Sequence, residues 1–511
     1  MFILKFTVCI LLLSKINSEQ LCSLREVEYG TVCVCNSSYC DTVPSIEDLS
    51  SGQYQLYTTS ESNLGFLSTT GNLSTNDSAA SVSVTVANLP STLQTIIGFG
   101  GAFTDSAGIN LVSLPEEAQT KLVESYFGED GLQYSLGRVP IGGTDFSTYG
   151  YTYCDEEDTN LTLACFELAS EDYNYKIPFI NQAISLRGNG TFRLFASVWS
   201  SPAWTKSNNA IEGTGVLNSE YYDWWARYFI KFFEAYEENN ITFWGVTPQN
   251  EPMDSFLSIT IPNLLHTPSQ MKTWIKDHLG PTIRNSTYSY LKIIALDDNR
   301  YLLPILKWFI LSDEDVLQYV DGVGIHWYVD LTTPASVIED AYNDNKELFA
   351  LATEACNGYI RITDIIKAVE LGSWTRGVNY INDIFDNLEY NVTGWTDWNL
   401  ALNTSGGPTF IDNNVDSPII VNATAGEFYK QPMFYALGHF SKFLVPDSVR
   451  VTSEVSGSNI RALAFLRPDE KVAVIIYNES SDDVSVNISI EGNSGTIEVP
   501  GNSINTFLYT Q

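Results

Sequence analysis

The chain has 511 residues, of which 44% are hydrophobic and 13% aromatic, and its formal net charge is −34 at pH 7. This apolar content excludes a disordered protein, and the length predicts more than one domain, although an α/β barrel alone can use about 250–400 residues. The strong negative charge argues against nucleic acid as a partner and against unaided docking on anionic lipid.

Residues 1–18 predict a secretory signal peptide, because a short basic element precedes an apolar run and a small polar exit near Ser18. No later apolar run approaches the ~18 residues of a membrane span. We therefore expect a soluble protein of the secretory pathway. Twelve N-x-S/T sequons agree with that route, and we expect several to be glycosylated: Asn36, Asn72, Asn76, Asn160, Asn189, Asn240, Asn285, Asn391, Asn403, Asn422, Asn478 and Asn487.

The mature chain begins with an even set of cysteines, namely Cys22, Cys33, Cys35 and Cys40. Their close spacing could bring thiolates together around zinc, but an oxidising compartment favours a pair of disulfides. Cys154 and Cys165 could pair across an acidic loop. Cys356 would then remain as a free thiol, which we expect to be packed rather than reactive.

Both ends of the mature chain alternate between apolar and polar residues, as in "SVSVTVANL" near residue 85 and "KVAVIIYN" near residue 475. Period-2 alternation with turn signals between the runs predicts antiparallel strands. We expect residues 47–95 and 448–511 to pair into one β-sandwich.

Between these pieces, short apolar runs alternate with amphipathic stretches such as 219–239. The predicted strands are 96–105, 134–146, 192–204, 241–252, 291–299, 320–328, 348–356 and 392–402. Eight strand–helix units over about 300 residues favour a (β/α)8 barrel. A doubly wound sheet is the alternative, but "GFGGAF" does not match the G-x-G-x-x-G fingerprint of the dinucleotide-binding version of that fold.

Two glutamates follow strands of the predicted barrel: Glu251, in "TPQNEP", after the fourth strand, and Glu354, in "LATEAC", at the end of the seventh. Taken alone, "TPQNEP" is equally well explained as a turn. Functional residues of such barrels lie at the carboxyl ends of the strands, so both acids should meet at one mouth, which predicts glycoside cleavage. A carboxylate pair could instead bind a metal, but the four histidines are not paired at ligand spacing, and we predict no metal.

Other strand-end residues have structural alternatives. Asp145, in "GGTDF", could cap a helix, and Trp199 and Trp398 could simply pack; their positions at the barrel mouth favour contact with a sugar. We interpret His326 and Asp397 as hydrogen-bonding neighbours of the site rather than as catalysts.

Longer motifs are more specific than these single residues: "FGGAFTDSAG", "RVPIGGTDFS", "HWYVD", "GWTDWNLALN", "DSPIIV" and "FYKQPMFYALGHFSKF". Together with "TPQNEP" and "TEAC" they resemble the glucosylceramidases of glycoside hydrolase family 30, over essentially the whole mature chain. The resemblance implies a barrel of residues 96–399 with 432–447, the sandwich, and a small β domain of 19–46 with 400–431. It also implies the disulfides Cys22–Cys33 and Cys35–Cys40.

For function, the resemblance implies a retaining β-glucosidase that hydrolyses glucosylceramide to glucose and ceramide without a cofactor. By the same resemblance Glu251 would be the acid/base and Glu354 the nucleophile, and an ionised Glu354 would then favour the protonated form of Glu251. The implied sugar contacts are Asp145, Trp199, Asn250, Trp398 and Asn413. The resemblance further implies a lysosomal lumen, with extracellular secretion as the alternative, peripheral contact with membrane lipid, and a saposin-like protein that presents the lipid.

Three residues depart from the pattern of that family: Asn299, Tyr359 and Asn414 stand where Gln, Ser and an aromatic residue are usual. All lie in or beside predicted loops at the barrel mouth, so they bear on the aglycone and not on the glucose site. Two other functions stay open: a non-catalytic carbohydrate-binding protein, and a β-glucosidase, xylosidase or β-1,6-glucanase acting on another glycoside.

Overall fold

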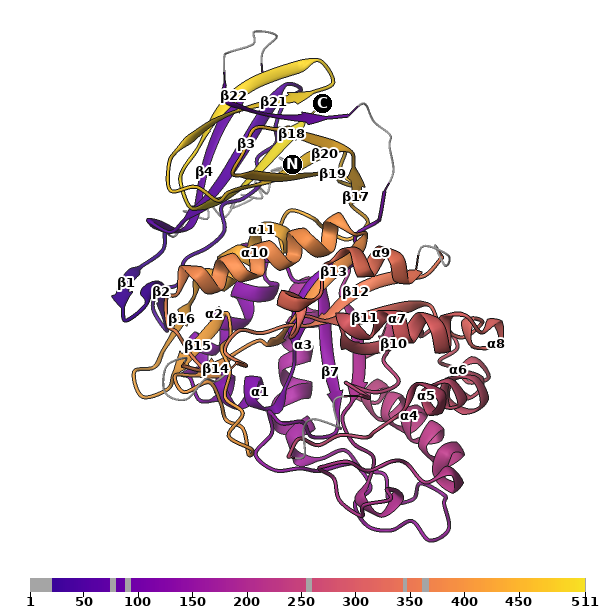
Figure 1. Cartoon of the computed structure of the whole chain (residues 1–511). Coiled ribbons are helices and arrows are strands. Elements are labelled where there is room, and N and C mark those ends of the chain that lie inside the picture. Colours follow the sequence, from indigo (N-terminus) through magenta and orange to yellow (C-terminus); the bar gives the residue numbers. More distant parts are fainter. Residues whose placement is uncertain are drawn as a thin grey trace, which may run out of the picture.

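The computed structural model describes residues 21–73, 80–87, 93–253, 260–342, 347–360 and 367–510. The predicted signal peptide and the sequon at Asn76 lie outside these ranges. Three β structures make up the described chain: a closed barrel, a two-sheet sandwich and a small sheet (Figure 1). Within the described residues, no helix combines the length and apolar character needed to cross a membrane.

The barrel consists of eight parallel strands that close on themselves, with β13 pairing to β6. Nearly every strand position is buried, as expected where helices cover a parallel sheet. Closure confirms the predicted barrel and excludes the doubly wound sheet. The strands are β6 (Gly98–Ala102), β7 (Leu136–Ile141), β8 (Arg193–Val198), β9 (Gly245–Val246), β10 (Lys292–Asn299), β11 (Gly322–His326), β12 (Phe349–Glu354) and β13 (Val392–Asn399).

The helices follow the apolar spacing of the sequence. In α4, which covers most of the predicted stretch 219–239, aromatic residues such as Trp225, Phe229 and Phe232 repeat at helical spacing and are buried. The α-helices are α1 (Asp105–Val112), α2 (Glu116–Phe127), α3 (Ile177–Arg187), α4 (Tyr222–Glu237), α5 (Pro268–Thr273), α6 (Gly280–Arg284), α7 (Leu303–Leu306), α8 (Glu314–Leu317), α9 (Ser336–Tyr342), α10 (Trp374–Glu389) and α11 (Pro432–Ser441). The π-helical segments are η1 (Asp172–Lys176), η5 (Trp274–Leu279) and η7 (Lys307–Leu311). The short 3-10 helices are η2 (Ala203–Thr205), η3 (Ser219–Tyr221), η6 (Arg300–Leu302) and η8 (Asp330–Thr332).

The fourth strand is much shorter than predicted, since only residues 245–246 of the expected 241–252 pair as β9. Pro248 has no backbone N–H to donate, which interrupts regular pairing. The chain still follows β8, because the N–H groups of Thr247 and Asn250 donate to Ala196 and Val198 at 2.8 and 2.9 Å. Glu251 therefore lies beyond the strand, at the barrel mouth.

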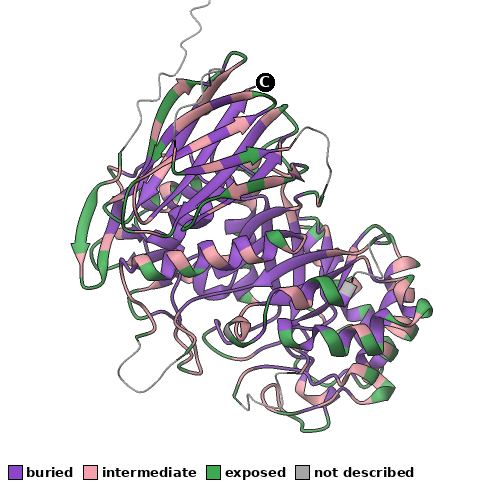
Figure 2. Cartoon of the chain, turned by 45° about the horizontal axis from the view of Figure 1, so that its top comes forward, coloured by how far each residue is buried: buried purple, intermediate pink, exposed green. Residues whose placement is uncertain are grey.

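The sandwich is built from both ends of the chain, as the alternation predicted. A six-stranded sheet in the order β17-β19-β20-β23-β3-β4 faces a four-stranded sheet in the order β18-β5-β21-β22, and apolar side chains of both sheets form a shared core. Figure 2 shows that much of these strands is buried. The strands are β3 (Gln53–Ser60), β4 (Asn63–Asn72), β5 (Val82–Val86), β17 (Val449–Val451), β18 (Ser453–Ser456), β19 (Ile460–Leu466), β20 (Lys471–Asn478), β21 (Val484–Ile490), β22 (Asn493–Val499) and β23 (Ser503–Thr510).

Helices α10 and α11 pack side by side between the sandwich and the barrel (Figure 1). Every residue of α11 is buried. His439 in this helix bridges two strands of the sandwich, with its ring nitrogens 2.8 Å from Thr506 Oγ1 and 3.0 Å from Thr59 Oγ1. Burial lowers the pKa of His439 to about 3, so the ring is neutral and accepts one of these hydrogen bonds.

The small sheet joins the start of the chain to residues around 402–430, in the order β1-β2-β16-β15-β14. Its strands are β1 (Leu24–Val27), β2 (Gly30–Asn36), β14 (Leu402–Asn403), β15 (Ile419–Asn422) and β16 (Glu427–Lys430). The structure contains the disulfides Cys22–Cys33, Cys35–Cys40 and Cys154–Cys165, and Cys356 is a buried free thiol. The residue limits of the three domains remain a prediction.

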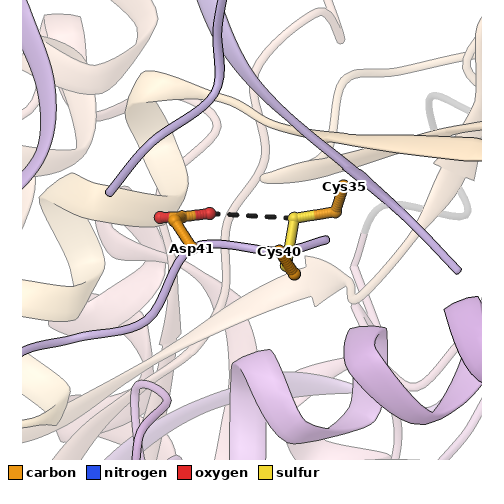
Figure 3. Close-up of side chains that lie close together, drawn as sticks. All are labelled: Cys35, Cys40 and Asp41. Carbon is orange, nitrogen blue, oxygen red and sulfur yellow. Dashed lines mark hydrogen bonds between the residues drawn. A yellow bond between two sulfur atoms is a disulfide. The ribbon is translucent and has the colours of Figure 1, made fainter. Parts of the chain in front are cut away.

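Cys35, Cys40 and Asp41 lie together in a way that superficially suits a metal ion (Figure 3). Cys35 Sγ is 3.7 Å from Asp41 Oδ1. Both sulfurs are bonded to each other, however, so neither is a thiolate and neither carries a proton to donate. The contact is one of packing, and the zinc alternative for these cysteines is excluded.

The predicted glycosylation sites differ in accessibility. Exposed asparagines include Asn72, Asn160, Asn189, Asn240 and Asn285. Asn478 is fully buried, and its Nδ2 donates to the carbonyls of Asp482 and Pro500, both at 2.9 Å. A glycan on that nitrogen would have to replace these bonds inside the sandwich, so the folded structure argues against Asn478 as a glycan site.

Candidate active site

A cavity of about 360 Å³ opens at the carboxyl ends of the barrel strands. It brings together all seven residues that the sequence singled out for catalysis or sugar contact: Asp145, Trp199, Asn250, Glu251, Glu354, Trp398 and Asn413. Asn413 comes from the loop between β14 and β15, whereas the others lie in barrel strands or just beyond them. Several loops therefore supply one site, as is usual for this fold.

The two glutamates are close neighbours. One oxygen of Glu251, one oxygen of Glu354 and a ring nitrogen of His326 all lie within 4.8 Å of one another. Glu251 has a positive φ of 41°, which is unusual for a residue with a side chain. Its N–H donates to the carbonyl of Asp297 at 2.9 Å, and this bond holds the strained residue against β10.

Arg138, in the middle of β7, organises the floor of the cavity. Its guanidinium donates to Glu354, to Asn250 Oδ1 at 2.8 Å and to Asp297 Oδ2 at 2.8 Å. Because Arg138 occupies the oxygen of the Asn250 amide, the NH2 end of that amide points away from the guanidinium. The arginine is fully buried, so these bonds replace its hydration.

Trp199 and Trp398 are almost fully buried and stack on each other, with ring centroids 5.0 Å apart and planes inclined by 16°. The Arg138 guanidinium lies 4.9 Å from the Trp199 ring centroid and 5.5 Å from that of Trp398. Both indoles therefore pack around the cation as well as lining the cavity. The packing and sugar-contact interpretations of these residues are compatible.

His326 bridges two carboxylates. Its Nδ1 lies 2.9 Å from Glu251 Oε1, and its Nε2 lies 3.0 Å from Asp297 Oδ1. Burial alone would lower the pKa of His326, but Glu354, Asp297 and Glu251 raise it to about 10. Burial alone would raise the pKa of Asp297, but Arg138 and His326 hold it well below its usual range. The geometry thus fits an imidazolium that donates from both nitrogens.

Tyr328 and Asp145 complete the surroundings of Glu354. The Tyr328 hydroxyl donates to Glu354 Oε1 at 2.7 Å. Asp145 Oδ2 accepts from Asn413 Nδ2 at 2.9 Å. Burial, and then the charge of Glu354, raise the pKa of Asp145 to about 7. In mildly acidic solution Asp145 therefore carries a proton that it can donate to a ligand.

Buried hydrogen bonds and ion pairs hold the loop that carries Asp145 in place. Asp105 Oδ2 accepts from Ser147 Oγ at 2.6 Å, and Ser147 Oγ accepts from the N–H of Thr144 at 3.0 Å. The buried Lys176 lies 3.7 Å from Asp105 Oδ1 and forms an ion pair of 2.8 Å with Asp172. It also donates to the carbonyl of Gly142 at 3.4 Å.

Glu251, His326 and Glu354 have the mutual spacing of metal ligands. The chemistry of the group does not fit a cation. Each ring nitrogen of His326 already lies within hydrogen-bond distance of a carboxylate, and Arg138 donates a hydrogen bond to the carboxylate of Glu354. A metal ion here would meet two positive charges at short range, which is unfavourable in a buried site.

The sequence analysis missed Arg138 and Asp297, although each is a charged residue inside a predicted barrel strand. That placement was the available signal, since a buried charge needs a partner. Of the three departures from the family pattern, Asn299 and Tyr359 line the cavity and Asn414 does not. Asp397 does not line it either; its Oδ1 accepts from the Tyr380 hydroxyl at 2.6 Å and from the Trp398 N–H at 3.0 Å.

Comparisons with known proteins agree with this architecture. Residues 96–444 match the model of the glycosyl hydrolase family 30 TIM-barrel domain, and residues 447–507 match that of the family 30 beta sandwich domain. The chain is 40% identical over 500 residues to putative glucosylceramidase 4 of Caenorhabditis elegans, covering 96% of this chain and 95% of that protein. It is 39% identical over 500 residues to the lysosomal acid glucosylceramidase of Mus musculus, covering 96% of each chain.

Among solved structures, SrfJ from Salmonella typhimurium superposes with a TM-score of 0.82 and 25% identity, covering 90% of this chain and 100% of SrfJ. The barrel with two neighbouring carboxylates at its mouth and the matched family models define a glycoside hydrolase. The chain belongs to glycoside hydrolase family 30.

Proposed function

We propose that the protein is a retaining β-glucosidase that hydrolyses glucosylceramide to glucose and ceramide, with Glu354 as nucleophile and Glu251 as acid/base. The names of the two relatives support the substrate. The distance between the carboxylate oxygens, within 4.8 Å, supports retention, because retaining glycosidases keep these groups about 5–5.5 Å apart.

The charge balance of the buried cluster carries the assignment of roles. Arg138 and the imidazolium of His326 supply two positive charges, and Asp297 and Glu354 supply two negative ones. A third ionised carboxylate would leave an uncompensated buried charge, so with Glu354 ionised the cluster is neutral only when Glu251 is protonated. Arg138 and Tyr328 both donate to Glu354, which suits the ionised form of that residue.

The chemistry follows from these protonation states. In the first step a Glu354 oxygen bonds to the anomeric carbon, the bond to the ceramide oxygen breaks, and the proton of Glu251 passes to that oxygen. The charge of Glu354 is then lost in the ester, so Glu251 can take a proton from water while the water oxygen attacks the anomeric carbon. The ester bond to Glu354 breaks, and glucose leaves in the β configuration.

The remaining cavity residues would bind the sugar. The NH2 group of Asn250, turned away from Arg138, would donate to the 2-hydroxyl, a contact that strengthens in the transition state. Asp145 and Asn413 would bind further hydroxyls as a pair. Trp199 and Trp398 would line an apolar face of the glucose ring.

We also propose that the protein works in the lysosomal lumen after secretory targeting, with secretion outside the cell as the alternative. The exposed sequons support passage through the secretory pathway. A saposin-like protein that presents the lipid is part of the same proposal, since the net charge of −34 gives no general attraction to anionic lipid.

The test is hydrolysis of glucosylceramide by the purified protein at about pH 5, an acidity that suits a carboxylic acid acting as general acid, beside Glu354→Gln and Glu251→Gln variants. The proposal requires glucose release by the wild type and its loss in both variants. Turnover of an aryl β-glucoside but not of the lipid would contradict glucosylceramide as the substrate. Asn299 and Tyr359, which line the cavity and depart from the family pattern, would then be the residues to examine for a different aglycone. Sugar binding without any turnover would instead favour a carbohydrate-binding protein.

A further inference from the structure

An exposed apolar face lies beside the mouth of the cavity. It consists of Tyr301, Ile305, Trp308 and Phe309, which are 43%, 39%, 77% and 44% exposed, and we refer to it as the 301–309 face. These residues belong to the continuous helical segment η6–α7–η7, close to the label α7 in Figure 1. Their spacing of four, three and one residues places them on one side of a helix.

The opposite side of the same segment is also apolar. Leu302, Leu303, Leu306, Ile310 and Leu311 are all buried. A helix with apolar residues on two opposite sides is normally packed on both of them, so the exposed apolar side of this segment is expected to contact another surface. Trp308 has the largest exposed fraction of any large hydrophobic residue in the described chain. Exposed apolar surfaces of this kind mark sites of interaction with protein or membrane.

The 301–309 face is continuous with the candidate active site. Tyr301 lines both the face and the cavity that holds Glu251 and Glu354. Ile305 lines a smaller apolar hollow of about 30 Å³, together with Pro252 and Met253, the two residues that follow Glu251. Whatever covers the face therefore lies next to the groups proposed to cleave the glucoside.

We propose that the 301–309 face inserts among the head groups and outer acyl chains of an uncharged lipid bilayer, and so places the cavity mouth on the membrane. This inference rests on the proposed function. Glucosylceramide carries its sugar directly on the ceramide, so the bond to be cleaved lies at the bilayer surface and the cavity has to approach that surface closely. Tryptophan and tyrosine suit this depth, since their rings are apolar and their N–H or O–H groups remain hydrated.

The charges around the face favour uncharged rather than anionic lipid. Lys272 and Lys276, on the neighbouring α5 and η5, form ion pairs with Asp313 and Asp315. Lys307 donates to the carbonyl of Asp340 at 2.8 Å. The basic groups are thus locally offset, and the chain as a whole is strongly negative, so attraction to anionic head groups is not expected. Binding should depend on apolar insertion.

The experiment compares the full-length wild type with the double variant Trp308→Ser/Phe309→Ser by flotation with phosphatidylcholine vesicles containing glucosylceramide. Tyr290→Ser is the matched control, because Tyr290 is 54% exposed but precedes β10, at the opposite end of the barrel. We expect the double variant to bind vesicles and to hydrolyse vesicle-embedded glucosylceramide at least about tenfold less well, which corresponds to ~1.4 kcal/mol. Its kcat/KM for a soluble aryl β-glucoside should match that of the wild type and the control.

Several outcomes would overturn the inference. Wild-type vesicle binding by the double variant would show that the face does not insert, and loss confined to stimulation by an added saposin would assign it to a protein partner. Concentration-dependent association of the wild type, abolished in the double variant without loss of vesicle binding, would assign it to a second copy of the chain. Failure of the proposed function looks different: the wild type would bind vesicles through the face and hydrolyse neither substrate.

Discussion

The guanidinium of Arg138 forms an ion pair with the carboxylate of Glu354 inside the barrel mouth, where both side chains are buried. The arginine comes from the second barrel strand and the glutamate from the seventh. This pairing connects Glu354 through Arg138 to Asn250 and Asp297. The electrostatics of the whole site depend on it.

Replacing Arg138 by Met should therefore destabilise the protein strongly. The change leaves Glu354 and Asp297 buried without their cation, and breaking a buried ion pair costs about 3–5 kcal/mol. Urea unfolding followed by tryptophan fluorescence measures the difference. Arg25→Met is the matched control, because its ion pair with Glu427 lies at the surface and should contribute less than about 1 kcal/mol. Equal effects of the two substitutions would contradict the account.

Asp145 should make the stability depend on pH. Its pKa is raised to about 7 in the folded state, against about 3.9 in an unfolded chain. Between these values the folded state binds more protons, so the contribution of Asp145 to the free energy of unfolding falls as the pH rises. Asp145→Asn mimics the protonated carboxyl, and its Tm should approach or exceed that of the wild type increasingly from pH 4 to pH 8. A Tm difference independent of pH would count against the assigned protonation.

His326→Gln should shift the pH profile of activity. The substitution removes a positive charge from beside Glu251, which makes the proton of that residue harder to lose. The basic limb of kcat/KM on an aryl β-glucoside should move upward by about one pH unit. His439→Gln, inside the sandwich interface, controls for general effects of removing a buried ring and should leave the limb in place. A limb that moves downward would mean that His326 does not act on Glu251 by its charge.

The disulfide between Cys154 and Cys165 should stabilise the acidic loop after Asp145. The two cysteines are 11 positions apart in the sequence, and such bonds typically contribute about 2–4 kcal/mol by restricting the unfolded chain. The variant Cys154→Ser/Cys165→Ser should show that loss in urea unfolding under oxidising conditions. With reductant present, the stability of the wild type should fall toward that of the variant. No difference between the two proteins in oxidising buffer would contradict this prediction.

Much of this structure could be predicted from patterns that are local in the sequence. Alternation gave the sandwich, apolar runs gave the barrel strands, and the position of Glu251 and Glu354 after two of those runs brought them to one mouth. The roles of Arg138 and Asp297 in the site could not be predicted, because they depend on contacts between side chains of β7, β10 and β12. These strands lie far apart in the chain. A charge in an apolar run carries no indication of its partner.

Other misses have the same origin. Pro248 could have indicated a short β9, because it has no N–H to donate, but the hydrogen bonds by which Thr247 and Asn250 continue along β8 could not be foreseen. The sequon at Asn478 reads like any other, and only the folded sandwich places its amide among the carbonyls of a turn. The apolar 301–309 face was likewise hidden, since its residues are continuous in sequence with buried leucines.

The most direct test of the central claim is to trap the covalent intermediate with a 2-deoxy-2-fluoro-β-glucoside that carries a good leaving group, and to locate the label by peptide mass spectrometry. The fluorine slows hydrolysis of the ester, while the leaving group departs without help from an acid. The account predicts one label, on Glu354, retained in Glu251→Gln and absent from Glu354→Gln. A label on another residue, or turnover that releases α-glucose, would contradict it.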